Sequence, residues 1–241
     1  MFRNIGVHLR DVVEARSLRF AFYRFLHIVN RKIQLPKGCF IGQELLSDEL
    51  CLEKYIDTSN PLVFLDIGAK TGLWSKRLAR KCIEIHGFEP NPETIALLKK
   101  STRKLKHFRL HQCAVGDKNE VKEFLINKRL ENCGFVDRYK GYTGTMEVPV
   151  RTIDSFNFDR VDLIKIDTEG YELPIINGAL KTIERERPQL YIEVHELEQE
   201  IPIKKILEGF DYTYVTHYME RSMKQPIIIT SPQISGDTYE D

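Results

Sequence analysis

The chain has 241 residues, of which 42% are hydrophobic and 29% charged, and its formal net charge is +1. This composition is typical of a folded globular protein and argues against a disordered chain. The near-neutral balance argues against wholesale nucleic-acid binding, because such domains are usually strongly basic. The five cysteines are odd in number and none has C-x-x-C spacing, so we expect a reduced, cytoplasmic protein rather than a zinc ribbon or a disulfide scaffold.

Residues 1–60 are predicted to form a helical segment ahead of the main domain. Its apolar residues repeat with the 3.6-residue period of a helix: Leu18, Phe22, Phe25 and Val29. Arginines are frequent in the same segment, and an amphipathic helix of this kind can lie on an anionic membrane. Packing against the main domain or a second subunit is the alternative. Peripheral membrane contact through residues 10–32 therefore stays open.

Strands and helices alternate in the predicted main domain, residues 61–230, and a polar tail is expected at 231–241. The predicted strands cover 63–67, 83–88, 108–115, 121–126, 146–150, 163–166, 190–194 and 212–216. The predicted helices cover 73–81, a segment starting after Asn91, 176–183 and 203–207. This alternation predicts an α/β fold with a parallel sheet covered on both faces. Such sheets bind ligands at the carboxyl ends of their strands.

A glycine-containing loop follows the first strand, at Asp66–Gly72 (DIGAKTG). Gly68 and Gly72 permit a tight turn and a close approach of ligand to backbone, and the next helix offers free N–H groups. Lys70 occupies the middle position of the dinucleotide pattern G-x-G-x-x-G, which disfavours a nicotinamide oxidoreductase. The spacing D-x-G-x-x-x-G is typical of the S-adenosylmethionine loop of many methyltransferases. A plain strand–turn–helix is the alternative.

Acidic residues follow the next two strands. Glu89 lies 23 residues after Asp66, close to the spacing of ribose-binding acids in related sheets, and it can accept both ribose hydroxyls. Ala114 and Asp117 can frame an adenine ring, with Asp117 accepting a hydrogen bond from its exocyclic amine. A simple Gly-Asp turn is the alternative there.

Charged residues also follow the fourth and fifth strands. Lys165, Asp167 and Glu169 lie at the end of an apolar strand, where charge is usually functional or paired. Glu193 and His195 are two residues apart and therefore share a face.

In this order, the motifs resemble the FkbM-type family of S-adenosylmethionine-dependent methyltransferases over residues 62–196. The resemblance is carried by Asp66–Gly72, Gly87–Asn91, Ala114–Asp117, Val150–Asp154, Leu163–Leu173, Arg187-Pro188 and Ile192–His195. It implies a Rossmann-like class I methyltransferase fold with a seven-stranded, mostly parallel sheet, and S-adenosylmethionine as the cofactor. Lys70-Thr71 departs from the family, which usually has Asn and a small or apolar residue.

The resemblance also implies the roles of individual residues. The expected cofactor-binding residues are Asp66, Gly68, Gly72, Glu89, Asn91, Ala114, Asp117 and Asp167. The fourth and fifth strands are expected to be neighbours, so that Asp167, Glu193 and His195 form the catalytic group. His195 is predicted to be the general base because its ordinary pKa lies near neutrality. Asp167 is expected to orient the nucleophile or steady the sulfonium, and Glu169 to cap the turn.

We expect no metal in this site. The alternative is that Asp167, Glu193 and His195 bind magnesium or manganese, which would lower the pKa of the hydroxyl that is methylated.

The expected reaction is O-methylation of a sugar, a glycan or a small hydroxylated metabolite. Aromatic and basic residues between 117 and 146 suit such an acceptor: Arg129, Arg138, Tyr139, Lys140 and Tyr142. An RNA or protein methyltransferase on the same fold, or a binding protein that has lost catalysis, are the alternatives. The sequence carries no strong nucleic-acid signal and no indication of oligomeric state.

Overall fold

The computed structural model describes residues 55–129, 132–138, 141–218 and 226–232. All its strands and helices belong to one compact unit that begins at Asp57. The predictions of an N-terminal helix, of membrane contact through residues 10–32 and of a polar tail beyond 232 lie outside the described residues.

The described residues form a seven-stranded sheet in the order β3-β2-β1-β7-β8-β10-β9. Its strands are β1 (Leu62–Ile67), β2 (Cys82–Phe88), β3 (Phe108–His111), β7 (Leu163–Ile166), β8 (Gln189–Glu193), β9 (Tyr212–Tyr218) and β10 (Pro226–Pro232). β3, β2, β1, β7 and β8 pair in parallel, whereas β10 is antiparallel to both β8 and β9. The predicted α/β fold with a mostly parallel sheet is therefore confirmed.

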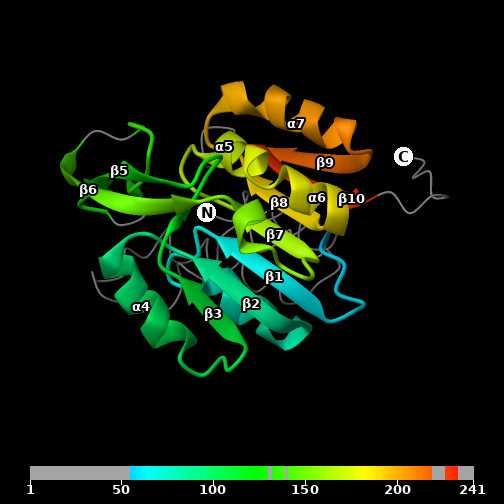
Figure 1. Cartoon of the computed structure of the whole chain (residues 1–241), viewed down its shortest axis with the longest axis horizontal. Coiled ribbons are helices and arrows are strands. Elements are labelled where there is room, and N and C mark those ends of the chain that lie inside the picture. The colour runs from blue at the N-terminus through cyan, green and yellow to red at the C-terminus, as the bar shows by residue number, and fades with distance from the viewer. Residues whose placement is uncertain (1–54, 130–131, 139–140, 219–225, 233–241) are drawn as a thin grey trace, which may run out of the picture. The chain divides into compact units, whose positions relative to one another are not determined.

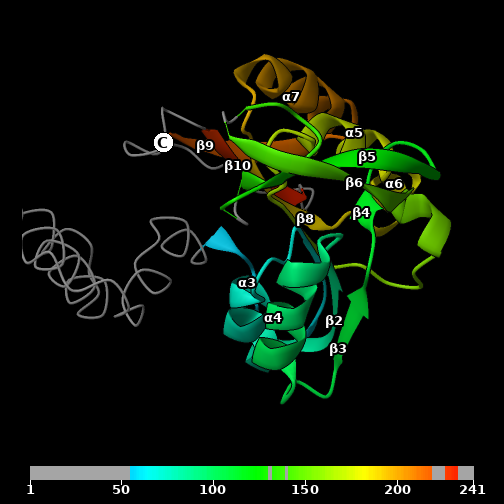
Figure 2. The same cartoon turned by 90° about the vertical axis from the view of Figure 1, so that its left-hand side faces the viewer.

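Helices cover both faces of this sheet. α3 (Leu73–Leu78) and α4 (Pro92–Thr102) lie on one face, and α5 (Glu172–Asn177) and α6 (Leu180–Glu186) on the other (Figure 2). α7 (Glu200–Gly209) runs beside β9 (Figure 1). Short 3₁₀ turns complete the set: η2 (Ala79–Lys81), η4 (Ile153–Phe156) and η5 (Leu197–Gln199).

The single helix predicted over 176–183 is two helices, α5 and α6, which are separated at Gly178. A Cβ at Gly178 would lie 1.9 Å from the carbonyl oxygen of Gly116. The glycine therefore allows the backbone after α5 to meet the backbone after β4 (Ala114–Val115).

The two central strands, β1 and β7, are buried along their whole length. Continuous apolar runs are expected for strands that helices cover on both faces. Each run is interrupted by one charged residue, Asp66 in β1 and Lys165 in β7, and these two residues are direct partners in the register. The charges therefore meet inside the sheet.

A second, three-stranded sheet has the order β4-β6-β5. It consists of β4 (Ala114–Val115), β5 (Glu120–Asn127) and β6 (Tyr142–Arg151), and Figure 1 shows β5 and β6 beyond the carboxyl ends of the central strands. The prediction of one strand over 108–115 is wrong, because the chain leaves the large sheet after β3 and pairs β4 in parallel with β6. Local sequence does not show which sheet a strand joins.

β10 was not among the predicted strands. The apolar residues at its centre, Ile227 to Ile229, are buried between β8 and β9. Prolines stand at both ends of the segment, where they remove ladder donors and favour edges or loops. The strand forms because its neighbours on both sides supply partners.

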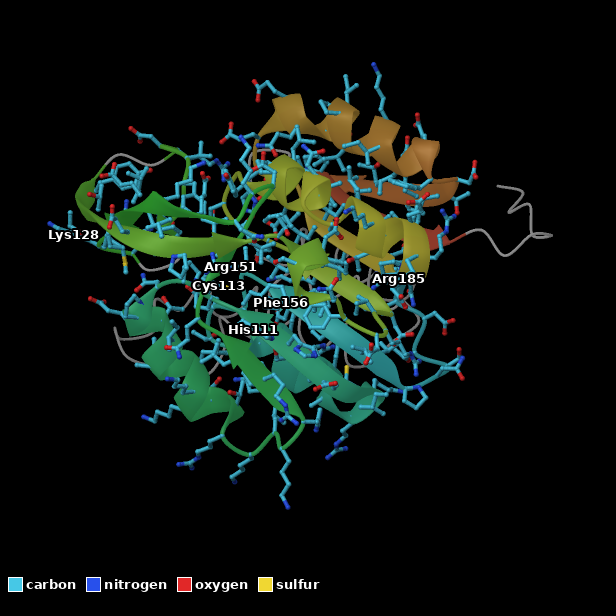
Figure 3. All side chains as sticks on the ribbon, viewed as in Figure 1. His111, Cys113, Lys128, Arg151, Phe156 and Arg185 are labelled. Atoms are coloured by element: carbon cyan, nitrogen blue, oxygen red, sulfur yellow. The ribbon has the colours of Figure 1, made fainter. Side chains whose placement is uncertain are left out.

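Histidines and aromatic rings pack together on β2 and β3. His111 stacks on Phe88 at 4.5 Å and meets Phe156 edge-on at 4.9 Å, and Figure 3 shows His111 and Phe156 side by side. His86 Nδ1 lies 2.9 Å from His111 Nε2. Burial and the neighbouring His86 lower the pKa of His111 to about 4, so this half-buried ring is neutral at pH 7.

Among the described residues, no helix has the length and apolar character needed to cross a bilayer. Cys82, Cys113 and Cys133 are free thiols, while Cys39 and Cys51 lie outside the part of the chain that is described.

The contact at Gly178 generates a prediction about stability. Gly178→Ala should lower the free energy of unfolding by about 1–3 kcal/mol, because an added methyl group would overpack against Gly116. Gly209→Ala is the matched control, since its Cβ would enter open space. Urea titration measures both, and an equal effect in the two variants would contradict the packing argument.

Candidate active site

A cavity opens at the carboxyl ends of β1, β2 and β7. Its walls come from the glycine loop, the end of β2, β4 and its small sheet, and the loop after β7. The lining residues are Ile67, Gly68, Lys70, Phe88, Glu89, Pro90, Thr94, Cys113, Ala114, Val115, Phe124, Cys133, Phe135, Asp167, Thr168, Glu169 and Tyr171. The cavity therefore lies where ligands bind in open α/β sheets.

The glycine loop turns through left-handed backbone at Gly68, Lys70 and Gly72, with φ of 72°, 52° and 77°. The N–H groups of Gly68 and Ala69 donate to the carbonyl of Phe88 at 3.1 and 3.0 Å. A Cβ at Gly68 would lie 2.0 Å from the carbonyl oxygen of Asp167. Only glycine allows the loop to approach β7 this closely, and the loop presents bare backbone to the cavity.

Glu89 is buried at the cavity wall with 7% of its surface exposed. Its two carboxylate oxygens accept hydrogen bonds from different backbone N–H groups, Oε2 from Lys70 at 3.1 Å and Oε1 from Asn91 at 3.0 Å. Burial raises the pKa of Glu89 to about 7, although both hydrogen bonds and the charges of Lys165 and Lys70 act in the opposite direction. Each oxygen keeps acceptor capacity for a ligand hydroxyl.

Of the other predicted cofactor residues, Ala114 and Asp167 also line the cavity. Gly72 and Asn91 support the loop and helix behind it: a Cβ at Gly72 would meet Leu98 at 2.8 Å, and Asn91 caps α4 by accepting from the N–H of Glu93. Asp117 is exposed and is not among the described lining residues, so the structure does not bring it to the cavity wall.

Asp66 is fully buried and is also absent from the described cavity wall. One of its oxygens accepts from Ser75 Oγ at 2.6 Å and from the Ser75 N–H at 3.2 Å. Its other oxygen lies 3.5 Å from Lys165 Nζ. Any influence of Asp66 on a ligand therefore passes through Lys165 and the start of α3.

Asp167 joins the cavity to a group of carboxylates. It lies 3.3 Å from Lys165 Nζ on one side and 3.7 Å from His195 Nε2 on the other. Burial alone would raise the pKa of Asp167, but the charges of Lys165, His195 and Lys70 lower it to about 2. Asp167 is therefore a fixed negative charge at neutral pH.

His195 is surrounded by carboxylates. Its Nδ1 lies 3.0 Å from Glu172, and its Nε2 lies 3.5 Å from Glu169 and 3.7 Å from both Asp167 and Glu193. Burial lowers the pKa of this imidazole, but the hydrogen bond to Glu172 and the charges of Asp167, Glu172 and Glu169 raise it to about 10. The ring is therefore a cation at neutral pH, and the ordinary pKa on which its prediction as a general base rested is not retained.

Glu172, rather than Glu169, caps the turn after β7. Its Oε1 accepts from the N–H of Gly170 at 2.9 Å and from the N–H of Thr168 at 3.4 Å. Glu169 instead has left-handed backbone, with φ of 59°, and is one of the residues that line the cavity. The capping role expected for Glu169 is thus corrected, and sequence analysis did not single out Glu172.

Arg138, predicted to contact substrate, is held by ion pairs to Glu169 at 3.3 Å and to Glu196 at 2.7 Å. It fastens its segment to the loop after β7. Tyr142 donates from its hydroxyl to the carbonyl of Val136, and Arg129 is exposed. Tyr139 and Lys140 lie outside the described residues.

Aromatic rings form a wall of the cavity that sequence reasoning missed. Phe135 packs edge-on against Phe124 at 5.2 Å and beside Tyr171 at 4.6 Å. Lys122 donates to the Tyr171 hydroxyl at 2.8 Å and lies over its ring. Two of these rings belong to the small sheet or the segment next to it, so no local pattern links them to the loop after β7.

Asp167, Glu193 and His195 each offer one ligand atom, and these atoms lie within 4.8 Å of one another. Carboxylate and imidazole ligands suit a divalent cation. A metal must bind the neutral imidazole, so a cation here would first displace the proton of His195.

In the large sheet, the last strand along the chain, β10, lies between β8 and β9 and is antiparallel to both. This strand order and the cavity at the carboxyl ends of the parallel strands define a class I methyltransferase fold. A family model described as the methyltransferase FkbM domain matches residues 66–221. The chain belongs to this FkbM family of methyltransferases.

The chain is also similar to two known proteins. The 2-O-methyltransferase NoeI of Sinorhizobium fredii (strain NBRC 101917 / NGR234) is 25% identical over 170 residues, which cover 61% of this chain and 70% of NoeI. The crystal structure of methyltransferase FkbM from Methylobacillus flagellatus KT matches with a TM-score of 0.54 at 16% identity, over 77% of this chain and 51% of that one. The chain thus spans about half the length of the solved relative, and this likeness is one of fold.

The carboxylates around His195 generate a prediction about pH. Because the folded-state pKa of about 10 lies above the unfolded value of about 6.5, charged His195 stabilises the fold fully below pH 6.5, and this contribution is lost as pH rises through 10. NMR titration of the ring nitrogens should find it protonated through pH 8. Glu172→Gln should lower this pKa markedly, and exposed Glu198→Gln should not. Titration of wild-type His195 near pH 6.5 would refute the assignment.

Proposed function

We propose that the chain binds S-adenosylmethionine in this cavity and transfers its methyl group to a hydroxyl of a sugar, a glycan or a small metabolite. The observation that carries the proposal is the joint lining of one cavity by Gly68, Glu89 and Asp167. Gly68 offers bare backbone, Glu89 accepts hydrogen bonds from hydroxyl groups, and Asp167 supplies a fixed negative charge. These three groups suit a nucleoside that carries a cationic centre.

The residues present fit this cofactor. At Gly68 there is no room for a Cβ, so the loop offers a close approach to its backbone. Glu89 is held by the N–H groups of Lys70 and Asn91 in a position to accept two ribose hydroxyls. The apolar wall formed by Ala114, Val115 and Phe124 suits an adenine face. Lys70 is an exposed residue, so its charge can remain solvated.

S-adenosylmethionine, when bound, supplies an activated methyl group, so positioning provides much of the rate. The protein must still accept the proton of the hydroxyl. Protonated His195 cannot do this at neutral pH. Glu169, which lines the cavity and pairs with Arg138 at 3.3 Å and with His195 at 3.5 Å, offers a carboxylate that can accept this proton.

The choice of a hydroxyl acceptor is supported by the similarity to NoeI, which is described as a 2-O-methyltransferase. An aromatic wall of Phe135 and Tyr171 next to the cavity suits stacking with a sugar ring.

Cofactor binding is tested by calorimetric titration with S-adenosylhomocysteine, with NAD as the negative control. Glu89→Ala should weaken binding of S-adenosylhomocysteine by about tenfold or more, because buried hydroxyl contacts are lost. Exposed Glu93→Ala, four residues along the chain, is the matched control and should leave the affinity unchanged. Absence of binding to the folded wild-type protein would refute the proposed function.

The acceptor class is tested with radiolabelled S-adenosylmethionine and a panel of methyl glycosides. Label is expected in at least one glycoside, as a methyl ether located by mass spectrometry. Bulk RNA and a protein extract are assayed in parallel. Label confined to either polymer would overturn the proposed acceptor while leaving the cofactor assignment intact.

A further inference from the structure

Lys165 is a charged residue at the centre of the large sheet that neither the cofactor contacts nor the proton transfer uses. It lies on β7, directly opposite Asp66 of β1, and only 3% of its surface is exposed. Desolvating an ammonium group is costly unless it is paired and hydrogen-bonded. The groups that contact Lys165 therefore indicate the role of its charge.

At least four oxygen atoms lie around the ammonium. Two belong to carboxylates, Asp66 at 3.5 Å and Asp167 at 3.3 Å. The other two are backbone carbonyls of the glycine loop, Gly68 at 2.9 Å and Ile67 at 3.4 Å. One buried cation thus joins the end of β1, the first turn of the loop and the end of β7.

The loop has separate restraints on its other side. Phe88 accepts from the N–H groups of Gly68 and Ala69, and Glu89 accepts from the N–H of Lys70. These bonds fix the loop to the end of β2. Lys165 supplies the opposing restraint from β7, so that the peptide at Gly68 is held between two strands.

The charge has a second effect. Asp66 and Asp167 are both within 3.5 Å of the same nitrogen, and without the ammonium these two carboxylates would repel each other. Asp167 is the one that lines the cavity. Removing the charge of Lys165 should therefore change both the loop and the direction of Asp167.

We infer that Lys165 is a positioning residue for the cofactor site, which holds the glycine loop and Asp167 in the arrangement that binds S-adenosylmethionine. The inference rests on the proposed function for the identity of the ligand. The holding of the loop itself does not depend on that identity.

The test uses Lys165→Gln, which keeps an amide donor but removes the charge, and Lys165→Met, which removes both. Two measurements are made on each full-length variant: calorimetric affinity for S-adenosylhomocysteine, and hydrogen exchange of segment 66–72 compared with β8. Lys76→Met is the matched control, since this lysine is exposed on the helix that follows the loop. Gly178→Ala provides a destabilised protein whose altered contact is with Gly116.

We expect both Lys165 variants to bind S-adenosylhomocysteine roughly tenfold or more weakly than wild type, with the larger loss in Lys165→Met. Segment 66–72 should exchange faster relative to β8 in both, and Gly178→Ala should show neither effect. Affinity within twofold of wild type in Lys165→Gln, or a uniform increase in exchange, would overturn the inference. So would failure of both variants to fold, because Lys165 would then serve the fold alone.

If the wild-type protein does not bind S-adenosylhomocysteine, the proposed function fails. The exchange measurement still decides whether Lys165 holds the loop, so the two failures are distinguishable.

Discussion

The central constraint of this structure is a buried charge cluster where β1 meets β7. Asp66 and Lys165 are register partners in two strands that are buried along their whole length, and Asp167 completes the cluster at the carboxyl end of β7. Just after the two strands end, the backbone of Gly68 lies so close to the carbonyl oxygen of Asp167 that Gly68 has no space for a side chain. The position of the glycine loop, and hence one wall of the cavity, depends on this contact.

A second electrostatic group lies beside the first and shares Asp167 with it. Glu169, Glu172 and Glu193 join Asp167 around His195, and the charges of Asp167, Glu172 and Glu169 make the imidazole a cation. The positive charge of His195 offsets the negative charges of the surrounding carboxylates and orients them. Lys165 does the same on the other side of Asp167. Lys165 and His195 together explain how several carboxylates can be buried at the carboxyl ends of these strands without uncompensated repulsion.

The small sheet closes one side of the cavity at the carboxyl ends of the central strands. β5 and the segment around Phe135 bring aromatic rings to the loop after β7, and Arg138 fastens this segment through Glu169 and Glu196. Since the fold alone does not fix function, we expect substrate choice to depend on the side chains of this wall.

Short-range patterns in the sequence were enough to predict the alternating elements, the parallel sheet, and Glu89 and Asp167 at strand ends. Hydrophobic periodicity and turn-forming residues are properties of neighbouring positions, so they can be recognised without the fold. Those patterns did not show that the segment at 108–115 divides between two sheets, or that β10 inserts between β8 and β9. They also could not show that Asp66 faces Lys165 or that Asp167, Glu169 and Glu172 raise the pKa of His195. Strand register, burial and the local electrostatic potential depend on residues that are far apart along the chain, so only the tertiary structure determines them.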